Sequence, residues 1–197
     1  MKSFKRNIIL LGKLFLPVIS CIGLIEVTYK HYLYVSPLSF GFIIILFNYM
    51  KIKYEFTISI LVSITLSFLS LFLSIAFYSI TGYLINQFFA FSELDINILG
   101  YSIKYLFLLL PIAVISPLLM FKSYRILFKI RNNIYYKNIK LASVILLLIY
   151  GLITNKFEKD YIIFWQFVMA LSLQLILYQD EIKAVFNKKF GLKMNKK

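Results

Sequence analysis

The chain alternates long stretches of apolar residues with short polar links. Six apolar stretches can be delimited, at residues 7–27, 34–50, 56–84, 98–121, 141–154 and 161–178. A helix that crosses a bilayer needs about 20 apolar residues, within a range of about 17–25. The pattern therefore predicts an all-α fold, a polytopic transmembrane helix bundle of about six spans.

Two of the stretches are short for a full crossing. Residues 34–50 and 141–154 are each at or below the length that a spanning helix needs, so either can lie at the membrane surface or enter it part-way. A bundle of four spans with two half-inserted segments is therefore the main alternative to six spans.

The basic residues alternate between successive links. Lys and Arg are concentrated at residues 2–6, 51–53, 122–140 and 183–197, whereas the links between these carry few of them. Because Lys and Arg mark the cytoplasmic ends of spans, we predict a multi-pass protein of the cell inner (cytoplasmic) membrane with both ends inside. Residues 1–197 then form a single transmembrane domain, with a basic cytoplasmic loop at 122–140 and a basic cytoplasmic tail at 180–197.

Composition and charge agree with a membrane setting. Apolar residues make up 61% of the chain, charged residues make up 15%, and the net charge is +14. A soluble domain is about 45–50% apolar and about 25% charged. A strong positive charge can indicate nucleic-acid binding, but here it lies between apolar stretches. We therefore expect the lipid bilayer and a cytoplasmic protein as partners, an oligomeric assembly, and no direct nucleic-acid binding.

Hydroxyl residues recur at helical spacing in the third apolar stretch. They are separated by three, four or seven positions, which places them on one stripe of a helix. Such a stripe is typical of a packing seam between membrane helices, and the lining of a polar path is the alternative interpretation. The predicted seam consists of Ser59, Ser63, Ser67, Ser70, Ser74 and Thr81.

The loop at 122–140 interleaves basic and aromatic residues. Its first basic residues are spaced by three and four, so we expect a helix that leaves the membrane with one basic and one apolar face. Such a surface can lie on anionic lipid or bind a cytoplasmic partner, and orientation of the spans alone is the simpler interpretation. The basic residues of this predicted surface are Lys122, Arg125, Lys129, Arg131, Lys137 and Lys140.

A few polar residues and prolines interrupt the apolar stretches. Lys13 and Glu26 lie near the ends of the first stretch, and ionisable residues inside membranes are functional candidates. Pro111 and Pro117 interrupt the fourth stretch, where each removes a backbone hydrogen bond and favours a kink. Buried amides such as Gln166 in the sixth stretch are expected to bind a neighbouring helix.

Residues that carry enzymatic chemistry are scarce. The chain has one histidine, His31, and one cysteine, Cys21, too few to build the usual metal sites. It has no glycine-rich phosphate loop, and no pair of aspartates lies inside an apolar stretch. We therefore expect no cofactor, no metal and no enzymatic activity.

The chain also resembles a known class in its overall format. In length, basic charge, composition and few-pass organisation it is similar to the small membrane components of prokaryotic phage-defence systems of the Kiwa type. The resemblance implies a sensor at the inner membrane that acts with a cytoplasmic DNA-binding partner, with 122–140 and the tail as the docking surface. The last two stretches also resemble accessory gene regulator peptidases, but the clustered His and Cys of those enzymes are missing.

Three classes of function follow from these features. The first is a non-enzymatic integral membrane subunit, a sensor, anchor or pore component that works with a cytoplasmic partner in antiviral defence. The alternative is a small-solute transporter or channel subunit, which the hydroxyl stripe and the two prolines favour. A membrane enzyme is the third and has the least support.

Overall fold

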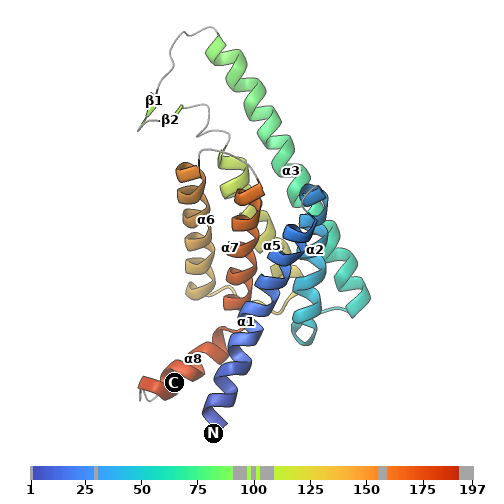
Figure 1. The fold of residues 1–197 in the computed structure, drawn as a ribbon, viewed down its shortest axis with the longest axis vertical. Helices are drawn as coiled ribbons and strands as arrows, with labels where there is room; N and C mark the ends of the chain where they lie inside the picture. Colours follow the sequence, from blue (N-terminus) through green and yellow to red (C-terminus); the bar gives the residue numbers. More distant parts are fainter. Residues whose placement is uncertain are drawn as a thin grey trace.

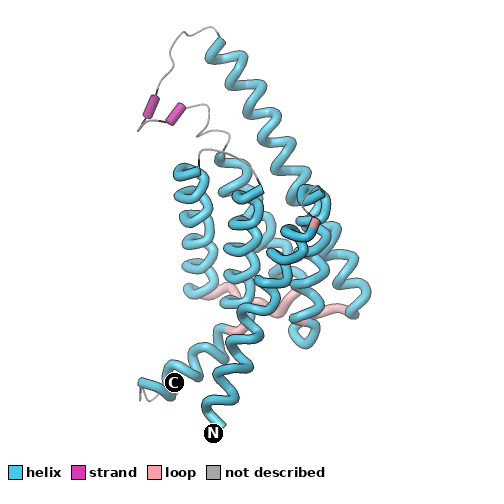
Figure 2. Tube along the Cα trace, viewed as in Figure 1, coloured by secondary structure: helices cyan, strands magenta, loops and turns pink. Residues whose placement is uncertain are grey.

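The computed structural model describes residues 2–28, 31–90, 97–98, 101–102, 109–154 and 159–190. These residues form a bundle of helices of unequal length (Figure 1, Figure 2). The longer helices are α1 (Lys2–Val27), α2 (Tyr32–Phe47), α3 (Phe56–Ala90), α5 (Ser116–Leu127), α6 (Ile134–Thr154), α7 (Lys159–Leu177) and α8 (Gln179–Phe190). The shorter elements are the 3-10 turn η2 (Tyr49–Lys51), the π-helical segment η3 (Pro111–Ile115) and the antiparallel strands β1 (Asn97–Ile98) and β2 (Tyr101–Ser102).

The helices pack as a chain of neighbours around a common core. Helix α1 contacts α2 and α7, α6 contacts α7, and α3 contacts α2, η3 and α5. Tyr124, Phe40 and Phe121 are among the largest side chains that are fully buried in this core. The outer surfaces of α1, α3 and α6 expose Ile, Leu and Phe side chains. So extensive an apolar surface is stable against lipid and not against water.

Four helices are long and apolar enough to cross a membrane. They are Lys5–Val27, Phe56–Leu84, Ile134–Thr154 and Lys159–Leu177. The described residues confirm the prediction of a helical bundle, and the length and composition of these four helices are those that a membrane crossing requires. The second apolar stretch forms the shorter apolar helix Tyr34–Phe47.

The fifth apolar stretch belongs to a longer helix than its apolar residues suggest. Helix α6 begins at Ile134, and its 21 residues extend to Thr154. Asn133 starts the helix, because its side-chain Oδ1 accepts a hydrogen bond of 2.8 Å from the backbone N–H of Tyr136, as an N-cap residue does. The prediction that 141–154 is short for a span therefore missed the first two turns of the helix.

The fourth apolar stretch, 98–121, is not one helix as predicted. It begins in the short strands β1 and β2, which pair through Asn97 with Ser102 and Ile98 with Tyr101. Helical structure is described from residue 109 onward, with α-helix at 109–110, then η3, and then α5, which ends at Leu127. Residues 99–100 and 103–108, which include Lys104, lie outside the described part of the chain.

The loop at 122–140 is likewise not a single amphipathic helix. Helix α5 ends at Leu127, residues 128–133 are not helical, and α6 follows. Phe128 has extended backbone angles and is fully buried. It forms an isolated β-bridge with Ile52, and the backbone N–H of Lys53 donates to the Leu127 carbonyl at 2.9 Å. These contacts stop the helix where its apolar face would otherwise continue.

Helices α2 and α3 approach each other closely at Gly41. A Cβ atom at this position would lie 2.8 Å from the backbone N and Cα atoms of Ile64, far inside the usual separation of carbon atoms. Beside this contact, the Ser63 hydroxyl donates a hydrogen bond of 2.9 Å to the Gly41 carbonyl. Glycine at position 41 therefore sets the distance between the two helices.

We predict that Gly41→Ala destabilises the bundle and that Gly23→Ala does not. Alanine favours a helix over glycine by about 0.5–1 kcal/mol, so the intrinsic effect is stabilising at both positions. Nothing lies within 4 Å of a Cβ atom at Gly23, whereas at Gly41 the methyl group meets the α3 backbone, and overpacking costs about 1–3 kcal/mol. Thermal unfolding in detergent measures the difference, and equal midpoints would contradict the close contact.

Candidate functional site

Five of the six hydroxyl residues in the predicted seam are buried on α3. The exposed fractions of Ser59, Ser63, Ser67, Ser70 and Ser74 are all 4% or less. Thr81 differs, because it lies further along α3 and donates to the Phe77 carbonyl of its own helix. The stripe therefore faces other helices over the length from Ser59 to Ser74, and Thr81 takes no part in a contact between helices that the structure describes.

The centre of the seam joins three helices through Ser63. Its hydroxyl donates to the Gly41 carbonyl of α2 at 2.9 Å, and its oxygen lies 2.7 Å from the Tyr124 hydroxyl of α5. A serine has one hydroxyl hydrogen, so Tyr124 must be the donor to Ser63. Ser67 Oγ, at 3.3 Å from the same phenol oxygen, then donates to Tyr124. The four residues form a directed chain of hydrogen bonds.

The seam continues toward the start of α5. Ser70 lies 3.1 Å from the Ser116 hydroxyl, and Ser74 donates to the Ser70 carbonyl at 2.7 Å. Ser116 is the first residue of α5 and directly follows the π-helical segment. Single π-turns inside helices occur frequently at functional sites.

A cavity of about 380 Å³ lies beside this part of the seam. Helices α2, α3, α5 and α7 and the segment η3 all contribute to its wall, which is mainly apolar. The lining includes Ser36, near the start of α2, and Tyr161, near the start of α7. Its deepest residue on α5 is Met120. The cavity therefore occupies the part of the bundle where α2 and α7 begin.

The amides of α7 behave differently from one another. Gln166 donates 2.6 Å hydrogen bonds to both the carbonyl and the hydroxyl oxygen of Ser36 on α2, as expected for a buried amide. Gln174 is fully buried, yet neither its oxygen nor its nitrogen has a hydrogen-bond partner among the described residues. The indole nitrogen of Trp165 is also buried without a partner there.

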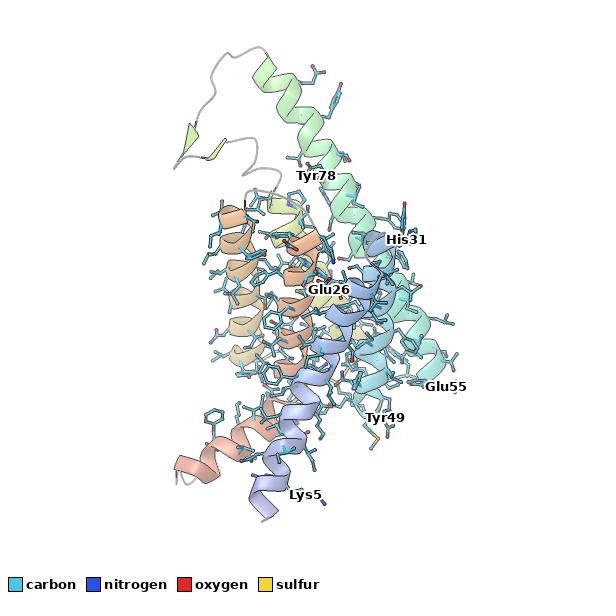
Figure 3. The ribbon with its side chains drawn as sticks, viewed as in Figure 1. Lys5, Glu26, His31, Tyr49, Glu55 and Tyr78 are labelled. Carbon is cyan, nitrogen blue, oxygen red and sulfur yellow. The ribbon has the colours of Figure 1, made fainter. Side chains whose placement is uncertain are left out.

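The basic residues gather at the opposite end of the bundle. Figure 3 shows Lys5, Tyr49 and Glu55 toward the end where α1 begins, and His31 and Tyr78 toward the other. Segments far apart in sequence meet at the basic end. Lys53 contacts the end of α5 by its backbone, and the Asn133 amide donates to the Gln179 side chain at 3.0 Å.

The six basic residues predicted as a surface lie at this end of the bundle. All but Lys140 are exposed, and Lys140 lies half-buried with its ammonium 5.9 Å from the Tyr136 ring. None of the six forms an ion pair with a carboxylate within the described part of the chain. A pocket of about 320 Å³ is lined by Lys129 and Arg131 together with Lys51, Gln179 and Asp180.

Ion pairs anchor α8 to this end of the bundle. The Glu181 carboxylate lies 2.9 Å from the Lys13 ammonium of α1 and 3.4 Å from that of Lys51. Both ammonium groups also lie over the Tyr178 ring, at 5.0 and 4.0 Å from its centre. Burial and the Glu181 carboxylate raise the pKa of Tyr178 to about 12, so the phenol stays neutral. Lys13 therefore has a structural partner.

The apolar side of the tail helix is also in contact with the bundle. Ile182 and Val185 of α8 pack with Leu10 and Leu14 of α1 around Tyr178. The tail helix α8 therefore packs part of its apolar face inside the protein. Phe186 is 56% exposed.

Glu26 and Cys21 of the first stretch, and His31 after it, have different surroundings. Glu26 pairs with Lys159 at the start of α7, 2.5 Å away, a contact that the sequence pattern gave no means to find. Cys21 is fully buried within α1, while His31 is exposed at the start of α2. Among the described residues, no three His, Cys, Asp or Glu side chains are grouped as metal ligands would be.

Comparison of the chain with protein-family models, with curated proteins and with solved structures finds no match. A function for this chain therefore has to be argued from its residues and their geometry.

We predict that Tyr124→Phe lowers the stability of the bundle by about 1 kcal/mol, because it removes two buried hydrogen bonds and little volume. Ser67 then loses its partner on another helix, and Ser63 keeps only its bond to Gly41. Tyr54→Phe is the matched control, since Tyr54 is 51% exposed. Unfolding in detergent compares the two variants, and equal stability of Tyr124→Phe and the wild type would contradict the hydrogen-bonded junction.

Proposed function

We propose that the chain is a multi-pass protein of the cell inner membrane that works as a non-enzymatic subunit and binds a cytoplasmic protein partner through its basic end. The observation that carries the proposal is the gathering of unpaired cations from separate segments at one end of the bundle. Six cationic side chains at 122–140 have no carboxylate partner among the described residues.

Orientation of the spans explains why basic residues occur at 122–140, but it does not explain the contacts that hold this link in place. The positive-inside effect requires Lys and Arg near the ends of spans, and flexible links satisfy it. Here the link after α5 is held by a β-bridge to Ile52 and by the bond from Asn133 to Gln179. Arg and Tyr, both present in this segment, are enriched in surfaces that bind proteins. An acidic partner surface would supply the missing counter-charges.

The proposed topology has six crossings with the basic end in the cytoplasm. Its spans are α1, α2, α3, the segment that ends in α5, α6 and α7. The start of α1, the turn at η2, the link after α5 and the start of α8 all lie at the basic end (Figure 1). That arrangement is what an even number of crossings requires. The alternative from the sequence was four crossings with residues 34–50 and 141–154 half-inserted, but 141–154 belongs to α6, which at 21 residues is long enough to cross.

The sequence suggests two further functions. The resemblance in format to phage-defence membrane components extends the proposal to antiviral defence, in which the partner would be the cytoplasmic effector. A small-solute transporter or channel is supported less. Its best support is the cavity beside the seam, but none of the described residues that line the cavity is charged, and the hydrogen-bonded Tyr124 lies between it and the basic end.

We predict the topology from fusions of alkaline phosphatase, which is active only outside the cytoplasm. A fusion after Ala90, at the end of α3, should be active, and a fusion after Phe190, at the end of α8, should be inactive. Enzyme activity per unit of fusion protein in membranes gives the readout. Activity of the Phe190 fusion would contradict an even number of crossings with the basic end inside.

We predict that a photo-crosslinking residue at Lys129 captures one cytoplasmic protein in living cells, whereas the same residue at Asp160, at the opposite end, does not. Adding Arg125→Glu with Arg131→Glu should abolish the adduct, because charge reversal repels an acidic partner. Arg125→Lys with Arg131→Lys is the matched control, since it preserves the charge that orients the spans.

Insertion of each variant is checked with the phosphatase fusion after Phe190. An adduct that persists after charge reversal in a correctly inserted protein would contradict docking on this face. If the adduct has the mass of a phospholipid and contains no protein, the basic residues bind the membrane surface and not a protein partner.

A further inference from the structure

The cavity beside the hydroxyl seam has the chemistry of a site for an uncharged, elongated molecule. No charged side chain among the described residues lines it, and an apolar enclosure inside a membrane cannot stabilise an ionised ligand. Its volume of about 380 Å³ falls at the lower end of ligand pockets, which enclose about 300–1,000 Å³. Along α3 the lining extends from Ser67 to Tyr78, a rise of about 16 Å at 1.5 Å per residue.

One polar group in the wall has no partner within the described part of the protein. Trp165 lines the cavity, and its indole N–H is buried without a hydrogen bond. An unsatisfied buried donor costs about 1–3 kcal/mol. The hydroxyl groups of the wall are already engaged, since Ser70 contacts Ser116 and Ser74 donates to its own helix. The indole N–H has almost no accessible surface, so a ligand in the cavity cannot reach it, and the wall suits a ligand that is apolar along its length.

The cavity lies away from the basic end of the bundle, at the level of one leaflet of the bilayer. Its lining begins near the ends of α2 and α7 that lie away from the basic end, and it extends inward to Met120. Ile75 and Tyr78 both line it and are 47% and 36% exposed. A molecule can therefore reach the cavity from the outer face of α3, which faces lipid in an inserted bundle.

We propose that this cavity binds the acyl chain of a membrane lipid from the leaflet opposite the basic end. An acyl chain supplies the two properties that the wall requires, an apolar surface and an elongated shape. The π-helical segment contributes Ile112 to the wall, and Ser116 follows it. The inference rests on insertion of the bundle in a membrane and is independent of the cytoplasmic partner.

The chain itself provides the reporter, because Trp165 is its one tryptophan. The full-length protein is reconstituted in lipid nanodiscs that contain phosphatidylcholine with bromine atoms on its acyl chains, since bromine quenches indole fluorescence on contact. A bound chain should quench Trp165 at low fractions of brominated lipid and then saturate. Exposure of Trp165 to bulk lipid gives quenching that rises with the brominated fraction throughout. A second series with brominated free fatty acid distinguishes a phospholipid chain from a free one.

Filling the cavity should at least halve the quenching. Ser74→Phe places a ring in the lining at a residue whose hydroxyl bonds only its own helix. Ser79→Phe, on the exposed side of the same helix, is the matched control and should leave quenching unchanged. If Ser74→Phe does not fold, Leu71→Phe in the lining and Leu69→Phe on the exposed face form a second pair.

Two results would overturn the proposal. One is the absence of quenching by either brominated lipid in the inserted wild-type protein. The other is equal, non-saturating quenching in the wild type and in the cavity-filled variant, which would show that Trp165 meets bulk lipid only. Because the phosphatase fusion reports insertion separately, neither result can be confused with failure of the proposed topology or of the partner surface.

Discussion

The contact between Gly41 and the backbone of α3 is the constraint on which the rest of the bundle depends. Burial of apolar side chains does little to hold helices together in lipid, which is itself apolar, so close packing and interhelical hydrogen bonds must do so. At Gly41 both occur at one point, because the missing side chain lets the Ser63 hydroxyl reach the Gly41 carbonyl. Tyr124 then joins α5 to the same hydroxyl. Three helices of the core are thereby fixed around one serine.

The same junction divides the bundle into two parts with different character. Toward the basic end, aromatic rings fill the space, with Phe40 edge-on to Tyr124 and Phe128 stacked on it. Toward the other end, the serines of the seam border a cavity instead of a packed core. The half of the bundle that is filled by aromatic rings and displays charge thus shares its helices with the half that contains the cavity.

The sequence predicted the elements of this architecture better than their connections. Long apolar stretches identify α1, α3 and α7, and regular spacing identifies the buried serines, since both signals are local. The beginning of α6 was missed because Lys137 and Lys140 interrupt the apolar pattern, although Asn133 is a recognisable cap. The break after Leu127 depends on Ile52, and the anchoring of Lys13 depends on Glu181. Pairings over such separations leave no periodic trace in a single sequence.

The length of α3 has a consequence for how the protein meets its membrane. Its apolar part, Phe56–Leu84, contains 29 residues and extends about 43 Å at 1.5 Å per residue, whereas the hydrocarbon layer is about 30 Å thick. A mismatch of this size is relieved by tilting, and α3 is inclined to α6 and α7 in Figure 1. Helices α6 and α7, with 21 and 19 residues, match the layer upright. Of these three spans, α3 is therefore the one whose inclination is coupled to bilayer thickness.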